Sequence, residues 1–161
     1  MENLDAIEQH LAVNLFGWFK VTQALLPLLR RSKGAIVANL SLAALAAVPV
    51  LSAYSISKAA AFNMMQSLRA LLAGQAVTVH AVLLGPIDTD MTRGLEIRKT
   101  APEFAAVGIF DGLERGEEEI FPDPVSQSIA GGWRSGVAKA LERQYATLVQ
   151  ESAANLDGRP Y

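Results

Sequence analysis

The chain contains no cysteine, which excludes disulfide bonds, a thiol nucleophile and a zinc site built from cysteine thiolates. Its two histidines, His10 and His80, lie seventy positions apart. The sequence therefore predicts no metal site.

An excess of charge of one sign is also missing. The 161 residues carry 14 Lys and Arg against 16 Asp and Glu, which gives a formal net charge of −2. Basic residues are scattered apart from a short run at 30–33. Because such a chain has no positive field to attract a phosphate backbone, nucleic acid is not an expected partner.

The third absence is an uninterrupted apolar run. Residues 35–57 carry no formal charge, but polar residues and a proline break the stretch, namely Asn39, Ser41, Pro49 and Ser52. A bilayer-spanning segment would not tolerate the order of strand, loop and helix start that this pattern indicates. The first residues also lack the basic-then-apolar order of a signal peptide. We therefore expect a cytoplasmic protein with no membrane partner.

With 51% hydrophobic and 19% charged residues, the chain has the composition of a compact globular protein. Apolar residues at helical spacing predict a helix that begins after Asn3 and ends at Gly34, with Pro27 expected to bend or interrupt it. A strand at 35–40, a helix at about 53–73 and a strand at 77–83 follow. This order predicts a parallel crossover unit.

The remaining pattern predicts a helix at about 102–114, a short strand within 117–122 and one final helix at about 126–152. No linker or repeat divides the chain. We therefore expect a single α/β domain over 1–161, with a short parallel sheet of about three strands flanked by helices.

One group of residues in this pattern has the chemistry of a proton-transfer site. Tyr54 and Lys58 are four positions apart, so they share one face of the predicted helix. Ionising a free Tyr at neutral pH costs about 4 kcal/mol, and a cation ~4 Å away at an effective dielectric of ~20 returns a similar energy. Lys58 is therefore expected to lower the pKa of Tyr54. Ser41 stands thirteen positions before Tyr54, where the strand at 35–40 opens into a loop that could reach a ligand.

This stretch resembles the short-chain dehydrogenase/reductase family, whose pattern is a catalytic Ser, a Tyr thirteen positions later and a Lys four positions after that. Upstream, the sequence 14–17 matches the family's Asn-x-x-Gly, and Asn14 stands 27 positions before Ser41. The resemblance therefore implies four catalytic residues, which are Asn14, Ser41, Tyr54 and Lys58.

The resemblance also implies their roles in hydride transfer between a nicotinamide coenzyme, NAD or NADP, and a small carbonyl or alcohol substrate. Tyr54 would exchange the proton, Lys58 would hold the nicotinamide ribose, Ser41 would donate to the substrate oxygen, and Asn14 would position a water. The stretch 85–91 is similar to the family's cofactor loop. Together with Tyr54 and Lys58, the coenzyme contacts would then be Gly85, Pro86, Ile87 and Thr89.

The family's nucleotide-binding front half has no counterpart in these 161 residues. Gly108, Gly112 and Gly116 follow no predicted strand, whereas a dinucleotide fingerprint needs a strand, a glycine-rich turn and a helix in that order. The resemblance is therefore to the C-terminal catalytic half, and the implied fold is a truncated, Rossmann-like, three-layer α/β fold. We expect coenzyme binding and activity to be impaired.

Two other functions are open to such a chain. One is a non-catalytic, truncated remnant that self-associates. The other is a cofactor-free hydrolase that uses Ser41, which is disfavoured because the residues around Ser41 are not Gly-x-Ser-x-Gly.

A second copy of the chain is the expected partner. The strand at 35–40 is apolar on both faces, which suits the interior of a sheet, and an open edge on it would invite pairing with another chain. The helical stretches 18–29 and 54–72 also carry broad apolar faces, which in this family commonly form a dimer contact. We therefore expect a homodimer or larger assembly that buries more than ~1,000 Å².

Overall fold

A computed structural model describes residues 2–157, with side chains to 149. The chain begins with one long helical stretch, made of α1 (Leu4–Leu11), the π-helix η1 (Ala12–Gly17) and α2 (Trp18–Ser32). Asn3 caps α1, since its Oδ1 accepts a hydrogen bond from the Ala6 amide at 3.0 Å. The helix runs through Pro27 without ending, so Pro27 does not interrupt it. The irregular part is instead the π-helical turn.

Three parallel strands form the sheet, which are β1 (Ala35–Asn39), β2 (Thr78–Val82) and β3 (Glu119–Ile120). They lie in the order β1-β2-β3, with Ala38 paired to Ala81 and Val82 to Ile120. The α/β fold with a short parallel sheet is thereby confirmed.

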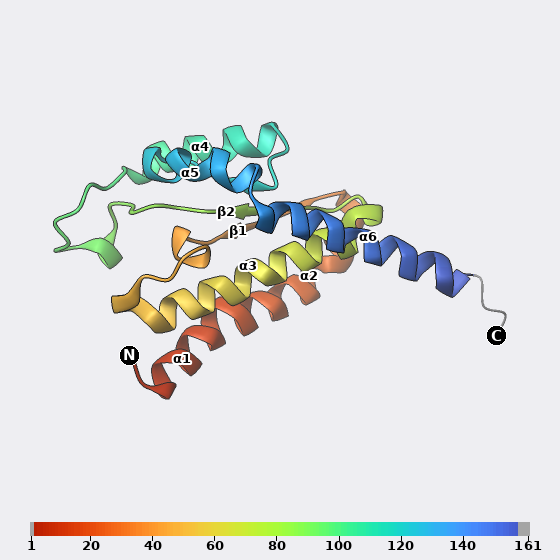
Figure 1. Ribbon diagram of the computed structural model, residues 1–161, viewed down its shortest axis with the longest axis horizontal. Helices are drawn as coiled ribbons and strands as arrows, with labels where there is room; N and C mark the ends of the chain where they lie inside the picture. Colours follow the sequence, from red (N-terminus) through yellow and green to blue (C-terminus); the bar gives the residue numbers. More distant parts are fainter. Residues whose placement is uncertain (1, 158–161) are drawn as a thin grey trace.

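Helices cover both faces of this sheet (Figure 1). The stretch α1 to α2 and the long helix α3 (Ser52–Leu72) lie on one face, while α4 (Pro102–Glu114) and α5 (Pro124–Arg134) lie on the other. Burial explains the arrangement: four consecutive residues of β2 are buried, β1 buries Ile36 and Ala38, and α3 contributes Phe62 and Met65 to the same core.

The final helical segment differs from its prediction. In place of one helix at 126–152, the structure has α5 and then α6 (Val137–Asp157), separated by Ser135 and Gly136. The turn is tight, because a Cβ on Gly136 would lie 2.8 Å from the Gly132 carbonyl oxygen. Apolar periodicity continues across this turn, and for that reason the pattern predicted one helix.

A buried group of charges fixes α6 to the rest of the fold. The Lys139 amine is 2.9 Å from carboxylate oxygens of both Glu119 and Glu142, and Arg69 on α3 also pairs with these two carboxylates. Burial opposes the charge of Lys139, but the hydrogen bonds that its amine donates to Glu118, Glu142 and Glu119 outweigh this effect and raise the pKa of Lys139. The three carboxylates lie within 4.8 Å of one another, as metal ligands do, yet here two cations already pair with them. The cluster therefore joins α3, β3 and α6.

Close packing holds α4 against β3 and against Pro122, which follows β3 in the chain. A Cβ on Gly108 would lie 2.5 Å from the Pro122 carbonyl oxygen, and one on Gly112 would lie 2.6 Å from Cγ2 of Ile120. These two helical glycines are therefore needed for contact and not for a turn.

We predict that Gly112→Ala lowers the free energy of unfolding by about 1–3 kcal/mol, because the new methyl group overpacks against Ile120. Gly131→Ala is the matched control: it lies in α5 with open space around its Cβ, and should raise the free energy of unfolding by about 0.5–1 kcal/mol through helix propensity. Urea denaturation of the two variants measures both values. Equal effects would contradict the packing argument.

Candidate active site

The site begins on the first turns of α3. Tyr54 and Lys58 lie on one face of the helix, and the Lys58 amine is 5.5 Å from the centroid of the Tyr54 ring. The same amine donates a hydrogen bond to the Asn39 carbonyl at 3.1 Å, at the carboxyl end of β1. The pair is therefore held at the edge of the sheet where open α/β folds bind ligands.

Ser41 comes from the loop that leaves β1. Its backbone is extended, with φ −150° and ψ 159°, and its Oγ accepts a hydrogen bond from the Ala43 amide at 3.1 Å. The Ser41 side chain also lies close enough to the Tyr54 phenol to lower its pKa. Three of the predicted residues, Ser41, Tyr54 and Lys58, thus meet at one place.

Burial dominates the electrostatics of this place. It raises the pKa of Tyr54, and the hydrogen bond from Ser41 offsets only part of the rise. Burial also lowers the pKa of Lys58. The expectation that Lys58 lowers the pKa of Tyr54 is therefore not met in this structure, because removing the phenol from water has the larger effect.

Asn14 is attached to the same helix from the π-helix η1. Its Nδ2 donates to the Ser57 Oγ at 2.9 Å, and this hydroxyl donates to the Tyr54 carbonyl at 2.7 Å. The chain Asn14, Ser57, Tyr54 joins the irregular turn to the first turn of α3. Isolated π-helical turns are frequent at functional sites.

Ser57 was not predicted from the sequence, although its place in the motif, three positions after Tyr54, was visible. Two further neighbours were also missed. The Glu2 carboxylate caps α3 by accepting hydrogen bonds from the Ala53 amide at 2.7 Å and the Ser52 hydroxyl at 3.1 Å, and these bonds lower the pKa of Glu2. The His10 ring meets the Tyr54 ring edge-on, with centroids 5.9 Å apart.

The predicted cofactor loop starts beside Ser41. The Leu42 amide donates to the Leu84 carbonyl at 2.9 Å, so Gly85 follows directly after a contact between the two loops. Further along, the Pro86 carbonyl accepts from the Thr100 amide at 2.9 Å, and the Thr100 carbonyl accepts from the Asp88 amide at 2.9 Å. This pairing fixes the part of the loop that contains Ile87.

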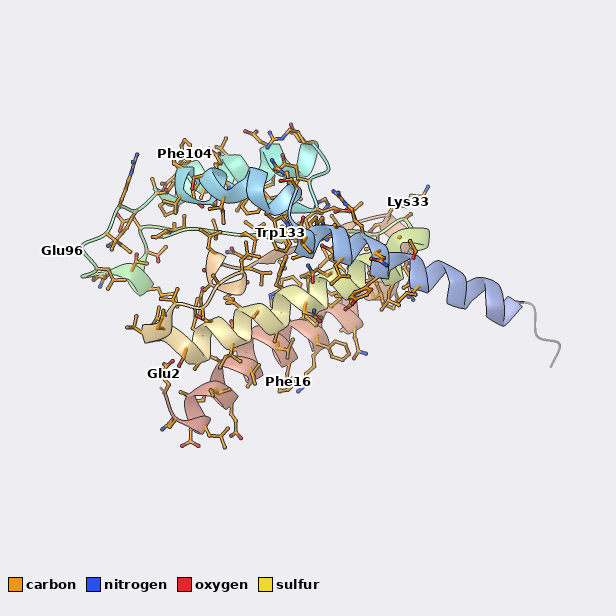
Figure 2. All side chains as sticks on the ribbon, in the orientation of Figure 1. Glu2, Phe16, Lys33, Glu96, Phe104 and Trp133 are labelled. Carbon is orange, nitrogen blue, oxygen red and sulfur yellow. The ribbon has the colours of Figure 1, made fainter. Side chains whose placement is uncertain are left out.

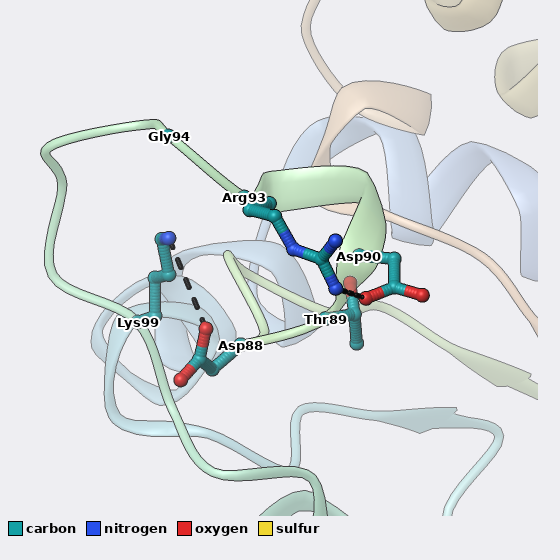
Figure 3. A pocket seen from close by; sticks show the side chains of 6 residues that line it. All are labelled: Asp88, Thr89, Asp90, Arg93, Gly94 and Lys99. Atoms are coloured by element: carbon teal, nitrogen blue, oxygen red, sulfur yellow. Dashed lines mark hydrogen bonds and ion pairs between the residues drawn. The ribbon is translucent and has the colours of Figure 1, made fainter.

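Thr89 lies further out, in an open cavity of about 280 Å³ (Figure 3). Two ion pairs border the cavity: Arg93 with Asp90, and Lys99 with Asp88 at 3.8 Å. Thr89 caps the short turn η5 (Asp90–Thr92) and its amide donates to the Thr92 hydroxyl at 3.2 Å. A hydrogen bond thus connects Leu84, the residue before Gly85, to the Ser41 side of the site, whereas Thr89 lines a polar cavity of its own.

Comparison with known proteins identifies the family. The model of the short chain dehydrogenase family matches residues 1–100, which is more than half of the chain. The chain therefore belongs to the short-chain dehydrogenase family, whose members are oxidoreductases.

Three relatives illustrate the similarity. The chain is 36% identical over 116 residues to "11-beta-hydroxysteroid dehydrogenase-like 3" of Arabidopsis thaliana, a match that covers 67% of this chain and 37% of that protein. It is 36% identical over 98 residues to "Inactive 2-(S)-hydroxypropyl-CoM dehydrogenase 2" of Xanthobacter autotrophicus, with 60% and 43% covered. A crystal structure of a short chain dehydrogenase from Burkholderia cenocepacia J2315 in complex with NADP superposes with a TM-score of 0.77 at 36% identity, with 89% and 60% covered. The chain thus spans less than two thirds of each of these relatives.

We predict that Lys58→Met raises the free energy of unfolding by a few tenths of a kcal/mol at pH 7, because folding removes part of the ammonium from water and its partial exposure screens the cost. The pKa of Lys58 is lower in the folded state than in the unfolded state. Above the unfolded-state pKa the amine is neutral in both states and burying it has no charge cost; as pH falls, the amine becomes charged and the wild-type protein loses stability. The advantage of the variant should therefore shrink as pH rises towards the ordinary pKa of lysine. Chemical denaturation at pH 7 and pH 10 measures it, with the exposed Lys20→Met as control; a destabilised variant at pH 7 would contradict the burial argument.

Proposed function

We propose that this chain carries the catalytic half of an NAD(P)-dependent short-chain dehydrogenase, which moves hydride between nicotinamide and a carbonyl or alcohol. The observation that carries the proposal is the position of Tyr54, which lies near both Ser41 and Lys58 at the carboxyl end of β1. Membership of the family supports the reaction type.

The protonation state of Tyr54 suggests how the reaction would proceed. Because its pKa is raised, the phenol stays protonated at neutral pH and is ready to give its proton to a carbonyl oxygen. The Ser41 hydroxyl would hold that oxygen, and the Lys58 ammonium would stabilise the phenolate that remains. The coenzyme, when bound, supplies the hydride.

The described residues fit the nicotinamide end of the coenzyme better than its adenine end. Lys58 and the Tyr54 hydroxyl offer polar contacts at the carboxyl end of β1. The loop from Gly85 to Thr89 follows the carboxyl end of β2, which is parallel to β1 and ends at the same edge of the sheet. None of the three described strands leads through a glycine-rich turn into a helix, the arrangement that binds a pyrophosphate. We therefore propose weak binding of NAD(H) or NADP(H) by these residues alone.

A non-catalytic remnant is the second candidate. One relative carries the word inactive in its name, and this chain spans 43% of that protein. A remnant would keep the fold and the helix packing, and would not need the proton on Tyr54.

Activity separates the two candidates. With NADPH or NADH and a panel of ketones and aldehydes, we expect slow reduction by the wild-type chain and a loss of at least about a hundredfold in Tyr54→Phe, which lacks the transferable proton. The matched control is Tyr145→Phe on α6, where the ring is 58% exposed, and it should keep wild-type activity. No reduction with either coenzyme, or equal activity in Tyr54→Phe, would favour the remnant.

We also propose that the partner of this chain is a second copy. The helical stretch α1 to α2 packs against the core through Trp18, Leu26 and Leu29, while its other side exposes large apolar residues, namely Leu4, Val13, Phe16, Phe19, Val21, Leu25 and Leu28. Figure 2 shows Phe16 on the outer side of this stretch, away from α4 and α5. Among the described strands β1 also has one free edge.

By length and composition, Leu4–Ser32 could also cross a membrane, and 6% of its most apolar window is buried. We favour a protein partner because one side of this stretch contacts α3, and Asn14 on that side donates a hydrogen bond to Ser57. A bilayer around the helix would displace those contacts.

Sedimentation velocity at tens of micromolar tests this partner. We expect a dimer or larger species for the wild-type chain and a monomer for the double variant Val21→Asp and Leu28→Asp, because two buried carboxylates would be desolvated in the contact. Val137→Asp, at a position 85% exposed on α6, should leave the assembly unchanged. A wild-type monomer, or recovery of the chain with membranes, would contradict the proposal.

A further inference from the structure

A fully buried carboxylate lies next to the predicted cofactor loop. Asp123 stands between β3 and α5, with none of its surface exposed. Its Oδ1 accepts hydrogen bonds from the Val125 amide at 3.0 Å and the Ser126 amide at 3.1 Å, which is the ordinary way to cap α5. Its Oδ2 accepts from the Ser126 hydroxyl and from the Gly85 amide, both at 2.8 Å. One oxygen thus caps a helix, and the other reaches the loop.

The support under this carboxylate is rigid. The Leu83 amide donates to the Ile120 carbonyl at 2.9 Å, so β2 fixes the segment before Asp123 on one side. From the other side, Gly108 of α4 packs so closely on Pro122 that a Cβ there would lie 2.5 Å from its carbonyl oxygen. Asp123 is therefore attached to the sheet and not to a mobile surface.

Gly85 is fitted to the same carboxylate. A Cβ at this position would lie 2.6 Å from Oδ1 of Asp123 and 3.0 Å from the Val125 Cβ, so any larger residue would push the loop away from α5. The close approach lets the Gly85 amide donate to Asp123, and it fixes where the loop leaves β2.

We propose that Asp123 is a positioning residue for the cofactor loop. By holding the Gly85 amide, it sets the start of the loop 85–89 relative to β2, while the pairing of Asp88 with Thr100 sets the part beyond Ile87. The loop is then ordered at both places before any coenzyme arrives, which reduces the entropy lost on binding. The effect of Asp123 on coenzyme binding rests on the proposed function, whereas its effect on the order of the loop does not.

Two substitutions separate the two tasks of Asp123. Asp123→Ser keeps a good cap for α5 but its single short hydroxyl cannot also reach Gly85. Ser126→Ala, the control, removes one hydroxyl from the same cluster and keeps the Gly85 bond. Far-UV circular dichroism checks that both variants retain their helices.

Hydrogen exchange of the Gly85 amide, followed by NMR on the full chain, is the direct test. In the wild type this amide should exchange as slowly as the amides of β2, and Asp123→Ser should speed its exchange by about tenfold or more, since a buried donor loses its acceptor. Ser126→Ala should leave it slow. If the wild-type amide exchanges as fast as that of the exposed Gly94, the proposal is overturned, even if no variant folds.

A coenzyme titration adds the functional readout. For a chain that binds NADPH, Asp123→Ser should weaken binding by about tenfold while leaving the rate at saturating coenzyme within about twofold, because the loop can still be ordered by the ligand. Unchanged binding together with fast Gly85 exchange would overturn the positioning role. A wild-type chain that binds no coenzyme contradicts the proposed function, and the exchange measurement then still decides the ordering of the loop.

Discussion

The partial burial of Tyr54 and Lys58 is the constraint on which the rest of the site depends. Burial raises the pKa of the phenol and lowers that of the amine, so both side chains are held where their charged forms are disfavoured. Because this burial disfavours their charged forms, other contacts must hold the two side chains in place. The Asn39 carbonyl accepts a hydrogen bond from the Lys58 amine, the Ser57 hydroxyl donates to the backbone carbonyl of Tyr54, and Ser41 lies near the phenol.

The fold supplies those contacts because α3 is fixed along its whole length. Near its start, the Glu2 carboxylate caps it and Asn14 of η1 is bonded to Ser57. Near its end, Arg69 pairs with Glu119 of β3 inside the buried charge cluster. A buried cluster of this kind contributes little net stability, but losing one partner leaves an uncompensated charge, so it favours a single position for the helix. The face of α3 that carries Tyr54 and Lys58 is thereby held beside the carboxyl end of β1.

Much of the fold was predictable because local periodicity and tertiary packing agree. The strand at 35–40, the helix at 53–73 and α4 were predicted to within a residue or two, since their apolar residues recur with the period of the element they form. The π-helix and the division between α5 and α6 were not predicted. Both irregularities leave the apolar stripe of the helix intact, so the apolar periodicity of the sequence does not reveal them.

The site divides in the same way. Asn14, Ser41, Tyr54 and Lys58 were named from the resemblance to the family's pattern, and the structure places them near one another, with Asn14 joined to Tyr54 through Ser57. The direction of the Tyr54 pKa was predicted wrongly, because distance alone suggests attraction to Lys58 while burial is a property of the packed fold. Asp123 lies 38 positions from Gly85, and no local pattern connects the two.

The central claim is that the described residues bind the nicotinamide end of the coenzyme beside Tyr54. The most direct measurement is an NMR titration of the ¹⁵N-labelled chain with reduced nicotinamide mononucleotide, which lacks the adenine half. The account predicts shifts at the amides of Ser41, Lys58 and Thr89, and little further gain in affinity with complete NADPH. An absence of shifts at these amides at millimolar ligand, or shifts confined to α5 and α6, would contradict it.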